Sequence, residues 1–134
     1  RSSLHPYFEE IADQKVSSHF LISRRGEVFQ FVSTQSKAWH AGASSFLGRE
    51  KCNDFSIGIE LEGDGDTAFE DSQYQALAKL MAELSKIYPK IQVAGHSDIA
   101  PERKTDPGKF FDWKKFQKAT DISQEKLPFG LDSR

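Results

Sequence analysis

The sequence predicts a mixed α/β (α+β) fold, a central mixed β-sheet with helices, with a helix packed on the sheet's apolar face and a loop-lined cleft on the other. Two β-rich runs lie within residues 16–32, a third run of alternating polarity covers 55–62, and a strongly amphipathic segment follows from about residue 71. Alternation with a period of two indicates strands, whereas apolar positions three and four residues apart indicate a helix.

The first strand pair comes from the runs VSSHFLI and EVFQFV, which Ser23-Arg24-Arg25-Gly26 joins. Two such runs around a short glycine-containing link predict a β-hairpin that turns near Gly26. Residues 33–54 contain Ser, Gly and Asn and show no sustained period. We therefore expect them to form a long functional loop.

The strand predicted over 55–62 places Glu60 on the face opposite Ile57, Ile59 and Leu61, because successive side chains of a strand point to opposite sides. The best helix in the chain follows, with Asp71 or Ser72 as its expected cap and Pro89 after its end. Its apolar stripe belongs to the core and consists of Tyr74, Leu77, Met81, Leu84 and Tyr88.

The C-terminal third contains shorter elements. A strand is expected over 91–95, leading into a polar loop that begins at His96, and a last amphipathic helix over 112–119. Residues 121–134 have weak periodicity and are expected to form a loose tail, which leaves 1–120 as a single domain. A chain of 134 residues is long enough for one core.

The composition is that of a soluble globular protein and argues against several partners. The net charge is −2 and the pI is about 6.1, so the basic excess of a general nucleic-acid or acidic-membrane binder is missing. No apolar run is long enough to span a bilayer, and no signal peptide opens the chain. Cys52 is the single cysteine, which excludes an internal disulfide and predicts a buried small side chain. A cytoplasmic monomer is the expectation.

His96 and Asp106 stand at the two ends of the loop HSDIAPERKTD and are candidate metal ligands. Hydrolytic zinc sites take three protein ligands from His, Cys and carboxylates, so this pair supplies two-thirds of such a site. Pro107 favours an extended backbone before it, which places Lys104 and Asp106 on the same side. A cation there would stabilise an oxyanion. The alternative is a surface ion pair between Lys104 and Asp106.

Glu60 is a candidate general base, because a carboxylate on the open face of a strand can take a proton from an attacking water. Gly58, two residues earlier on the same face, leaves room for a ligand. A solvated strand glutamate with no chemical role is the alternative. Trp39 and His40 form a candidate cleft wall suited to a sugar ring, although loop tryptophans are as often packing residues. His19 is expected to be a structural histidine rather than a ligand.

Four basic residues flank these segments and, if they converge, would suit an anionic peptide: Lys15, Arg49, Lys51 and Arg103. Four stretches taken together then carry a resemblance: HPYF through VSSHFLI, AWHAG, CNDFSIGIELEG and GHSDIAPERKTDPG. They resemble the N-acetylmuramoyl-L-alanine amidase type 2 family over about residues 5–117, and most closely its cytosolic AmpD-type 1,6-anhydro branch.

The resemblance implies the amidase type 2, or peptidoglycan-recognition-like, fold with Zn²⁺ in a cleft. It implies His96 and Asp106 as zinc ligands, Glu60 as the catalytic carboxylate and Lys104 as the oxyanion-stabilising cation. It also implies that the substrate-binding residues are Trp39, His40, Lys15, Lys51 and Arg103. The family's first zinc ligand, a histidine on an N-terminal strand, has no counterpart here, so the sequence is expected to be a fragment whose N-terminal piece is a separate partner.

The function implied is zinc-dependent hydrolysis of the amide bond between (1,6-anhydro-)N-acetylmuramic acid and L-alanine of muropeptides, during cell-wall recycling in the bacterial cytoplasm. The alternative is an inactive peptidoglycan-binding or muropeptide-binding module without a complete zinc site. Retention of Glu60, Lys104 and Asp106 together favours the enzyme, because a pure binder has no need of all three. A protein-interaction domain finds no support in an exposed apolar stripe.

Overall fold

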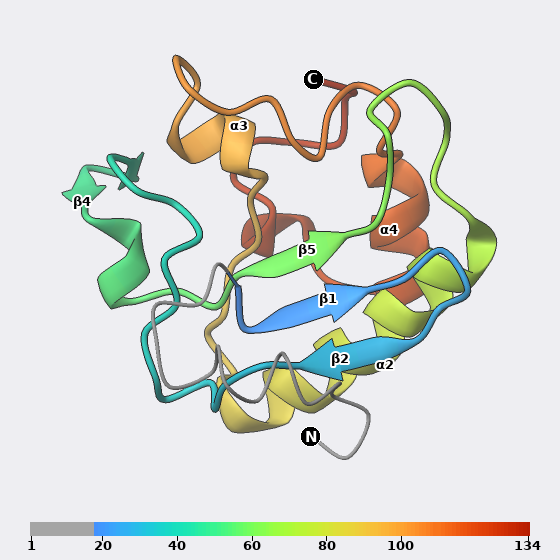
Figure 1. Cartoon of the computed structure of the whole chain (residues 1–134), viewed down its shortest axis with the longest axis horizontal. Coiled ribbons are helices and arrows are strands. Elements are labelled where there is room, and N and C mark those ends of the chain that lie inside the picture. The colour runs from blue at the N-terminus through green and yellow to red at the C-terminus, as the bar shows by residue number, and fades with distance from the viewer. Residues whose placement is uncertain (1–17) are drawn as a thin grey trace.

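A computed structural model describes residues 18–134 and contains the predicted mixed sheet (Figure 1). Its three strands are β1 (Phe20–Ile22), β2 (Val28–Gln30) and β5 (Ile59–Leu61), in the order β2-β1-β5. β1 runs antiparallel to β2 and parallel to β5. The predicted mixed α+β architecture is therefore confirmed.

The hairpin between β1 and β2 turns where the sequence predicts. Ser23 and Glu27 close the turn through a 2.9 Å backbone hydrogen bond, and Gly26 adopts φ +81°. A Cβ at Gly26 would also lie 2.8 Å from the carbonyl oxygen of Ser72. Glycine is thus required both by the left-handed backbone and by the close approach of the next helix.

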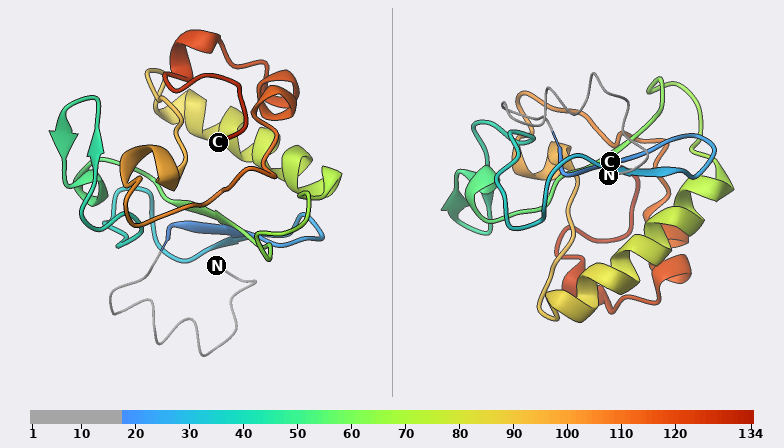
Figure 2. Two further views of the ribbon diagram at one scale, coloured as in Figure 1. Left: turned by 90° about the horizontal axis from the view of Figure 1, so that it is seen from above. Right: turned by 60° about the horizontal axis from the view of Figure 1, so that its bottom comes forward.

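Helices cover one face of this sheet (Figure 2). They are α2 (Asp71–Ile87) and α4 (Trp113–Thr120), which pack against each other as well. The cap of α2 is Glu70 rather than the predicted Asp71 or Ser72. Glu70 wins because it completes a capping box with Gln73, whose side chain accepts the Glu70 backbone N–H at 2.9 Å.

One aromatic and aliphatic core fills the space between helices and sheet. Phe111 stacks on Tyr74 at 5.3 Å and meets Trp113 edge-on at 4.8 Å between ring centroids. Apart from these, the buried members are Phe20, Ile22, Ala76, Leu77, Met81, Leu84, Phe116, Ile122 and Leu127. The helical stripe predicted as core is confirmed for its first four members, while Tyr88 is partly buried at the end of α2.

The expectation of a loose segment over 121–134 is wrong as far as packing is concerned. Ile122 and Leu127 belong to the buried core, and the short helix η2 (Gln124–Lys126) lies between them. The backbone N–H of Val93 donates to Lys126 at 2.8 Å. The buried apolar residues of this segment lack helical spacing, which is why periodicity does not reveal its packing.

Two further expectations need correction. Residues 91–95 are extended but form no strand, because Val93 bonds to the C-terminal segment instead of a sheet ladder. The loop predicted over 33–54 contains a small ribbon, β3 (Ser45–Phe46) with β4 (Arg49–Glu50), and the short helix η1 (Cys52–Asp54). Cys52 is buried, as predicted. Among the described residues no helix is both long and apolar enough to cross a membrane.

Candidate metal centre

His96 opens the single-turn helix α3 (His96–Ile99), and its ring is 9% exposed. Asp98 fixes the start of this turn by accepting the backbone N–H of Gly95 at 2.8 Å. Arg134 in turn donates to both carboxylate oxygens of Asp98, at 2.7 and 2.9 Å. The candidate ligand therefore sits on a backbone held by a bidentate ion pair from the C-terminal segment.

Asp106 lies directly beside His96. The backbone N–H of Ser97 donates to the Asp106 carbonyl at 2.9 Å, which ties the two ends of the polar loop together. Asp106 Oδ2 is 2.5 Å from His96 Nδ1. Two residues ten positions apart thus meet atom to atom, as a shared ligand site requires.

Glu60 completes the cluster from the middle of β5, where it pairs with Leu21 of β1. Its Oε2 atom is 3.8 Å from His96 Nδ1, and its side chain is 39% exposed. Ile57, Ile59 and Leu61 pack against the core on the opposite side, which confirms the predicted alternation. One potential ligand atom from each of Glu60, His96 and Asp106 lies within 4.8 Å of the others.

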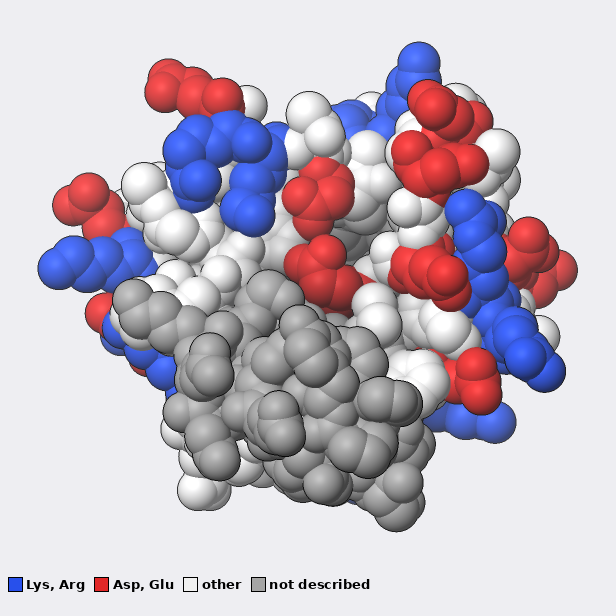
Figure 3. Space-filling view, in the orientation of Figure 1, with Lys and Arg blue, Asp and Glu red and all other residues white. Residues whose placement is uncertain are grey.

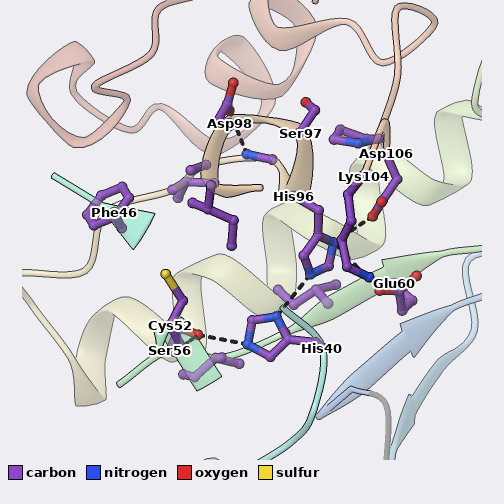
Figure 4. Close-up of a pocket in the computed structure, with 18 of the residues that line it drawn as sticks. His40, Phe46, Cys52, Ser56, Glu60, His96, Ser97, Asp98, Lys104 and Asp106 are labelled. Atoms are coloured by element: carbon purple, nitrogen blue, oxygen red, sulfur yellow. Dashed lines mark hydrogen bonds and ion pairs between the residues drawn. The ribbon is translucent and has the colours of Figure 1, made fainter. Parts of the chain in front are cut away.

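Lys104 and Asp106 point toward the same space as Glu60 and His96, as the extended loop predicts (Figure 4). On the molecular surface, acidic side chains border a hollow near the middle of this face, and Lys and Arg side chains gather over α3 and the following loop (Figure 3). The residues that line the cleft include Glu60, His96, Lys104 and Asp106, together with Gly58 and Pro107. The cleft is open enough for a substrate to reach the carboxylates.

The pKa values of Glu60 and Asp106 are shifted in opposite directions. Burial raises the pKa of Glu60, and the charge of Asp106 adds to this, while His96 and Lys104 oppose it. Burial also opposes ionisation of Asp106, but the hydrogen bond and charge of His96 outweigh it and lower the Asp106 pKa. When the environment moves the pKa values of two neighbouring carboxyl groups apart in this way, the group with the lower pKa suits a ligand and the other suits proton transfer.

The donor set fits a borderline divalent cation. One imidazole nitrogen and carboxylate oxygens are the ligands that zinc accepts in hydrolytic sites. The short contact between His96 Nδ1 and Asp106 Oδ2 needs a proton between these two atoms, and a metal ion can take the place of that proton. Glu60 Oε2 lies farther from His96 Nδ1, at 3.8 Å.

His40 lines the cleft, but its ring nitrogens face the protein. It is 5% exposed, with Nδ1 2.9 Å from His96 Nε2 and Nε2 2.7 Å from Ser56 Oγ. Burial, followed by the charges of His96, His19 and Lys104, lowers the pKa of His40 to about 4. The sequence does not indicate a role for Ser56. The spacing of positions 40, 56 and 96 does not predict that His40 contacts both Ser56 and His96.

The other predicted substrate-binding residues lie around the cleft rather than among its described lining residues. Trp39 is 44% exposed, with Lys37 Nζ 4.3 Å from its ring centroid. Lys51 is exposed at the start of η1. Arg103 donates to the carbonyl oxygens of Ala41 and Ala43 and so braces the loop that carries His40. Lys15 lies outside the described residues.

His19 has the structural role expected of it. The ring is fully buried, Nε2 donates to the carbonyl of Ser36 at 2.6 Å, and Nδ1 accepts the backbone N–H of Gly58 at 3.0 Å. Both nitrogens are therefore committed to backbone groups of the segments on either side of the cleft. His19 holds these segments in place and offers no free ligand atom.

Fold and site together define an α+β domain with a candidate hydrolytic metal centre. The chain belongs to the N-acetylmuramoyl-L-alanine amidase family (Amidase_2), whose family model matches residues 1–109. This confirms the family that the sequence motifs indicate.

Characterised relatives agree with this assignment. The chain is 56% identical over 115 residues to the 1,6-anhydro-N-acetylmuramyl-L-alanine amidase AmpD of Escherichia coli, covering 84% of this chain. That alignment spans 63% of the relative's own length, so the chain corresponds to less than two-thirds of it.

Solved structures show the same fold. A crystal structure of a selenomethionine AmpD derivative superposes with a TM-score of 0.76 and 54% identity, covering 89% of this chain and 68% of that one. The amidase AmiD of E. coli, in complex with the substrate anhydro-N-acetylmuramic acid-L-Ala-D-γ-Glu-L-Lys, superposes with a TM-score of 0.73 and 37% identity, covering 82% of this chain and 50% of that one.

Proposed function

We propose that this chain forms the catalytic part of a zinc-dependent amidase, which hydrolyses the bond between (1,6-anhydro-)N-acetylmuramic acid and L-alanine in muropeptides during bacterial cell-wall recycling in the cytoplasm. The observation that carries the proposal is the convergence of Glu60, His96, Asp106 and Lys104 in one cleft. The AmpD relatives and the substrate bound in the AmiD structure support the reaction and substrate class.

In this proposal His96 and Asp106 would hold the zinc ion, with the His96 ring nitrogen that faces Asp106 as one ligand. When bound there, zinc would supply Lewis-acid polarisation of the scissile carbonyl and make water more acidic. A hydrolytic site takes three protein ligands, so the proposal requires one more beyond this pair. Among the described residues, Glu60 is the nearby carboxylate, and its raised pKa suits proton transfer better than ligation.

The proposed steps use the side chains that meet in the cleft. Glu60 removes a proton from water as the water oxygen bonds to the lactyl carbonyl carbon of the substrate. Lys104 stabilises the negative charge that develops on the carbonyl oxygen. Protonated Glu60 then delivers its proton to the alanine nitrogen as the C–N bond breaks. The products are the free lactyl carboxylate of the sugar and a peptide with a free amino terminus.

The test is Glu60→Gln, assayed on anhydro-muramyl-tripeptide with zinc content measured in the same preparation. Loss of the general base should lower turnover by about 100- to 10,000-fold while bound zinc stays at its wild-type level. Glu62→Gln, an exposed carboxylate at the end of the same strand that accepts the Arg24 N–H, is the matched control and should retain turnover. Wild-type turnover in Glu60→Gln would overturn the role, and a wild-type chain that binds muropeptide without cutting it would favour a binding module.

A further inference from the structure

A line of hydrogen bonds leads from the candidate ligand His96 along the wall of the cleft to His40 and Ser56 (Figure 4). His96 Nε2 is 2.9 Å from His40 Nδ1, and His40 Nε2 is 2.7 Å from Ser56 Oγ. Ser56 Oγ is 2.5 Å from the carbonyl oxygen of Cys52. The line thus connects a ring in α3 to the backbone of η1 through two side chains.

The last group in this line fixes the direction of every bond. A carbonyl oxygen only accepts, so the Ser56 hydroxyl donates its proton to Cys52 and presents a lone pair to His40. His40 Nε2–H then donates to Ser56, which leaves His40 Nδ1 as an acceptor in the neutral ring. His96 Nε2 must therefore carry a proton, which leaves Nδ1 to face Asp106 and Glu60. The 2.5 Å contact between Nδ1 and Asp106 Oδ2 holds a second proton when no metal is bound, and a metal ion would replace that proton.

Packing holds the middle member in place. A Cβ at Gly58 would lie 2.4 Å from Cγ of His40, so the ring packs closely against this glycine just before β5. His40 is also 5% exposed. Rotation of the ring would leave buried nitrogens without hydrogen-bond partners, which is unfavourable.

We propose that His40 and Ser56 are positioning residues that fix the orientation and tautomer of His96 so that its Nδ1 faces the metal. The proposal rests on the zinc site proposed above and adds residues that do not touch the ion. It also gives His40 a different role from a substrate-binding wall, since both of its nitrogens are engaged within the protein. Partners of this kind typically change metal affinity by about 10- to 100-fold.

Three variants of the present chain test it. Ser56→Ala removes the acceptor for His40 Nε2–H, and Ser56→Thr restores a hydroxyl. Ser44→Ala is the matched control: Ser44 accepts the backbone N–H of Cys52 at 3.2 Å, and so contacts the same short helix outside the line. Zinc affinity, measured by competition with a chromophoric chelator, should fall about 10- to 100-fold in Ser56→Ala. It should recover in Ser56→Thr and stay unchanged in Ser44→Ala.

A second readout separates this role from simple stabilisation. Long-range ¹H–¹⁵N spectra of the imidazole groups in the zinc-free wild type, at one neutral pH, should show His40 protonated on Nε2 alone. In Ser56→Ala this single tautomer of His40 should be lost. A chemical unfolding curve for each variant shows whether it is folded. The proposal is overturned by a His40 proton on Nδ1 in the wild type, or by equal zinc affinity in Ser56→Ala and wild type. If the wild type binds no zinc, the metal site fails, and the spectra still decide the direction of the hydrogen bonds.

Discussion

The two faces of β5 carry residues of opposite kinds. Ile59 and Leu61 pack against the core that α2 and α4 complete, whereas Glu60 between them opens onto the cleft with its charged neighbours. One three-residue strand therefore carries both core residues and the proposed catalytic carboxylate. The comparison teaches that substitutions on the helix side should change the free energy of unfolding, while substitutions on the cleft side should change zinc binding or turnover.

The strongest way to test the helix side is Phe116→Ala. Phe116 is 2% exposed and contacts the rings of Phe111 and Trp113. Truncation leaves a cavity in the aromatic core and should lower the free energy of unfolding by about 3–5 kcal/mol, as measured by denaturant titration. Zinc bound per folded chain should not change. If Phe116→Ala had the unfolding free energy of the wild type but bound less zinc, the proposed difference between the two faces would be wrong.

On the cleft side, Lys104→Met should have the opposite profile. Loss of an oxyanion-stabilising cation should lower kcat by about 100- to 1,000-fold, while the unfolding free energy stays close to that of the wild type. Lys114→Met, which removes an exposed lysine on α4, serves as the control in the same steady-state assay. Unchanged kcat in Lys104→Met would remove Lys104 from the mechanism.

The C-terminal segment connects the two sides, and Arg134→Ala sharpens the comparison there. Asp98 has a side chain that is 6% exposed and loses its bidentate partner in this variant. Charge-assisted hydrogen bonds contribute about 1.5–3 kcal/mol each, so both the unfolding free energy and zinc affinity should fall together. Arg134→Lys cannot make the bidentate contact and should recover only part of the loss. An effect on neither quantity would show that α3 needs no such support.

The smallest expected effect concerns Tyr74, whose hydroxyl accepts the backbone N–H of Asp112 at 2.8 Å. Tyr74→Phe should cost about 1 kcal/mol of unfolding free energy. Burial, the largest cause, raises the pKa of Tyr74 above its ordinary value of 10.0. The unfolded chain then releases the proton first, so this tyrosine's contribution is present below pH 10.0 and declines as the pH rises above it. Denaturant curves should show a weaker alkaline loss in Tyr74→Phe, and an equal loss would contradict the shift.

The sequence predicts those parts of the fold that have a periodic pattern of apolar and polar residues. Alternation placed Glu60 opposite the core, helical spacing predicted the buried face of α2, and the loop from His96 to Asp106 was recognised as a pair of ligands. These features depend on local spacing and on residue type, which a sequence displays directly. The structure adds that the ligand atoms of Glu60, His96 and Asp106 meet within 4.8 Å.

The features that were missed depend on contacts between distant segments. Ser56 reaches His96 only through His40, and the cap of α2 is decided by Gln73 rather than by the usual preference for Asp or Ser. Arg103 resembles a ligand-binding cation in the sequence, yet it is hydrogen-bonded to carbonyl oxygens of the His40 loop. Its proposed contact with substrate stays a prediction, as do those of Trp39 and Lys51.

The most direct test of the proposed metal centre is elemental analysis of zinc per chain after incubation with zinc and exchange into zinc-free buffer. Wild type and Asp106→Asn would be compared, because the amide replaces the carboxylate with little change in shape. We expect measurable zinc in the wild type and a large loss of it in Asp106→Asn, with the fold intact by circular dichroism. No zinc in the wild type, or equal zinc in both proteins, would contradict a centre built on His96 and Asp106.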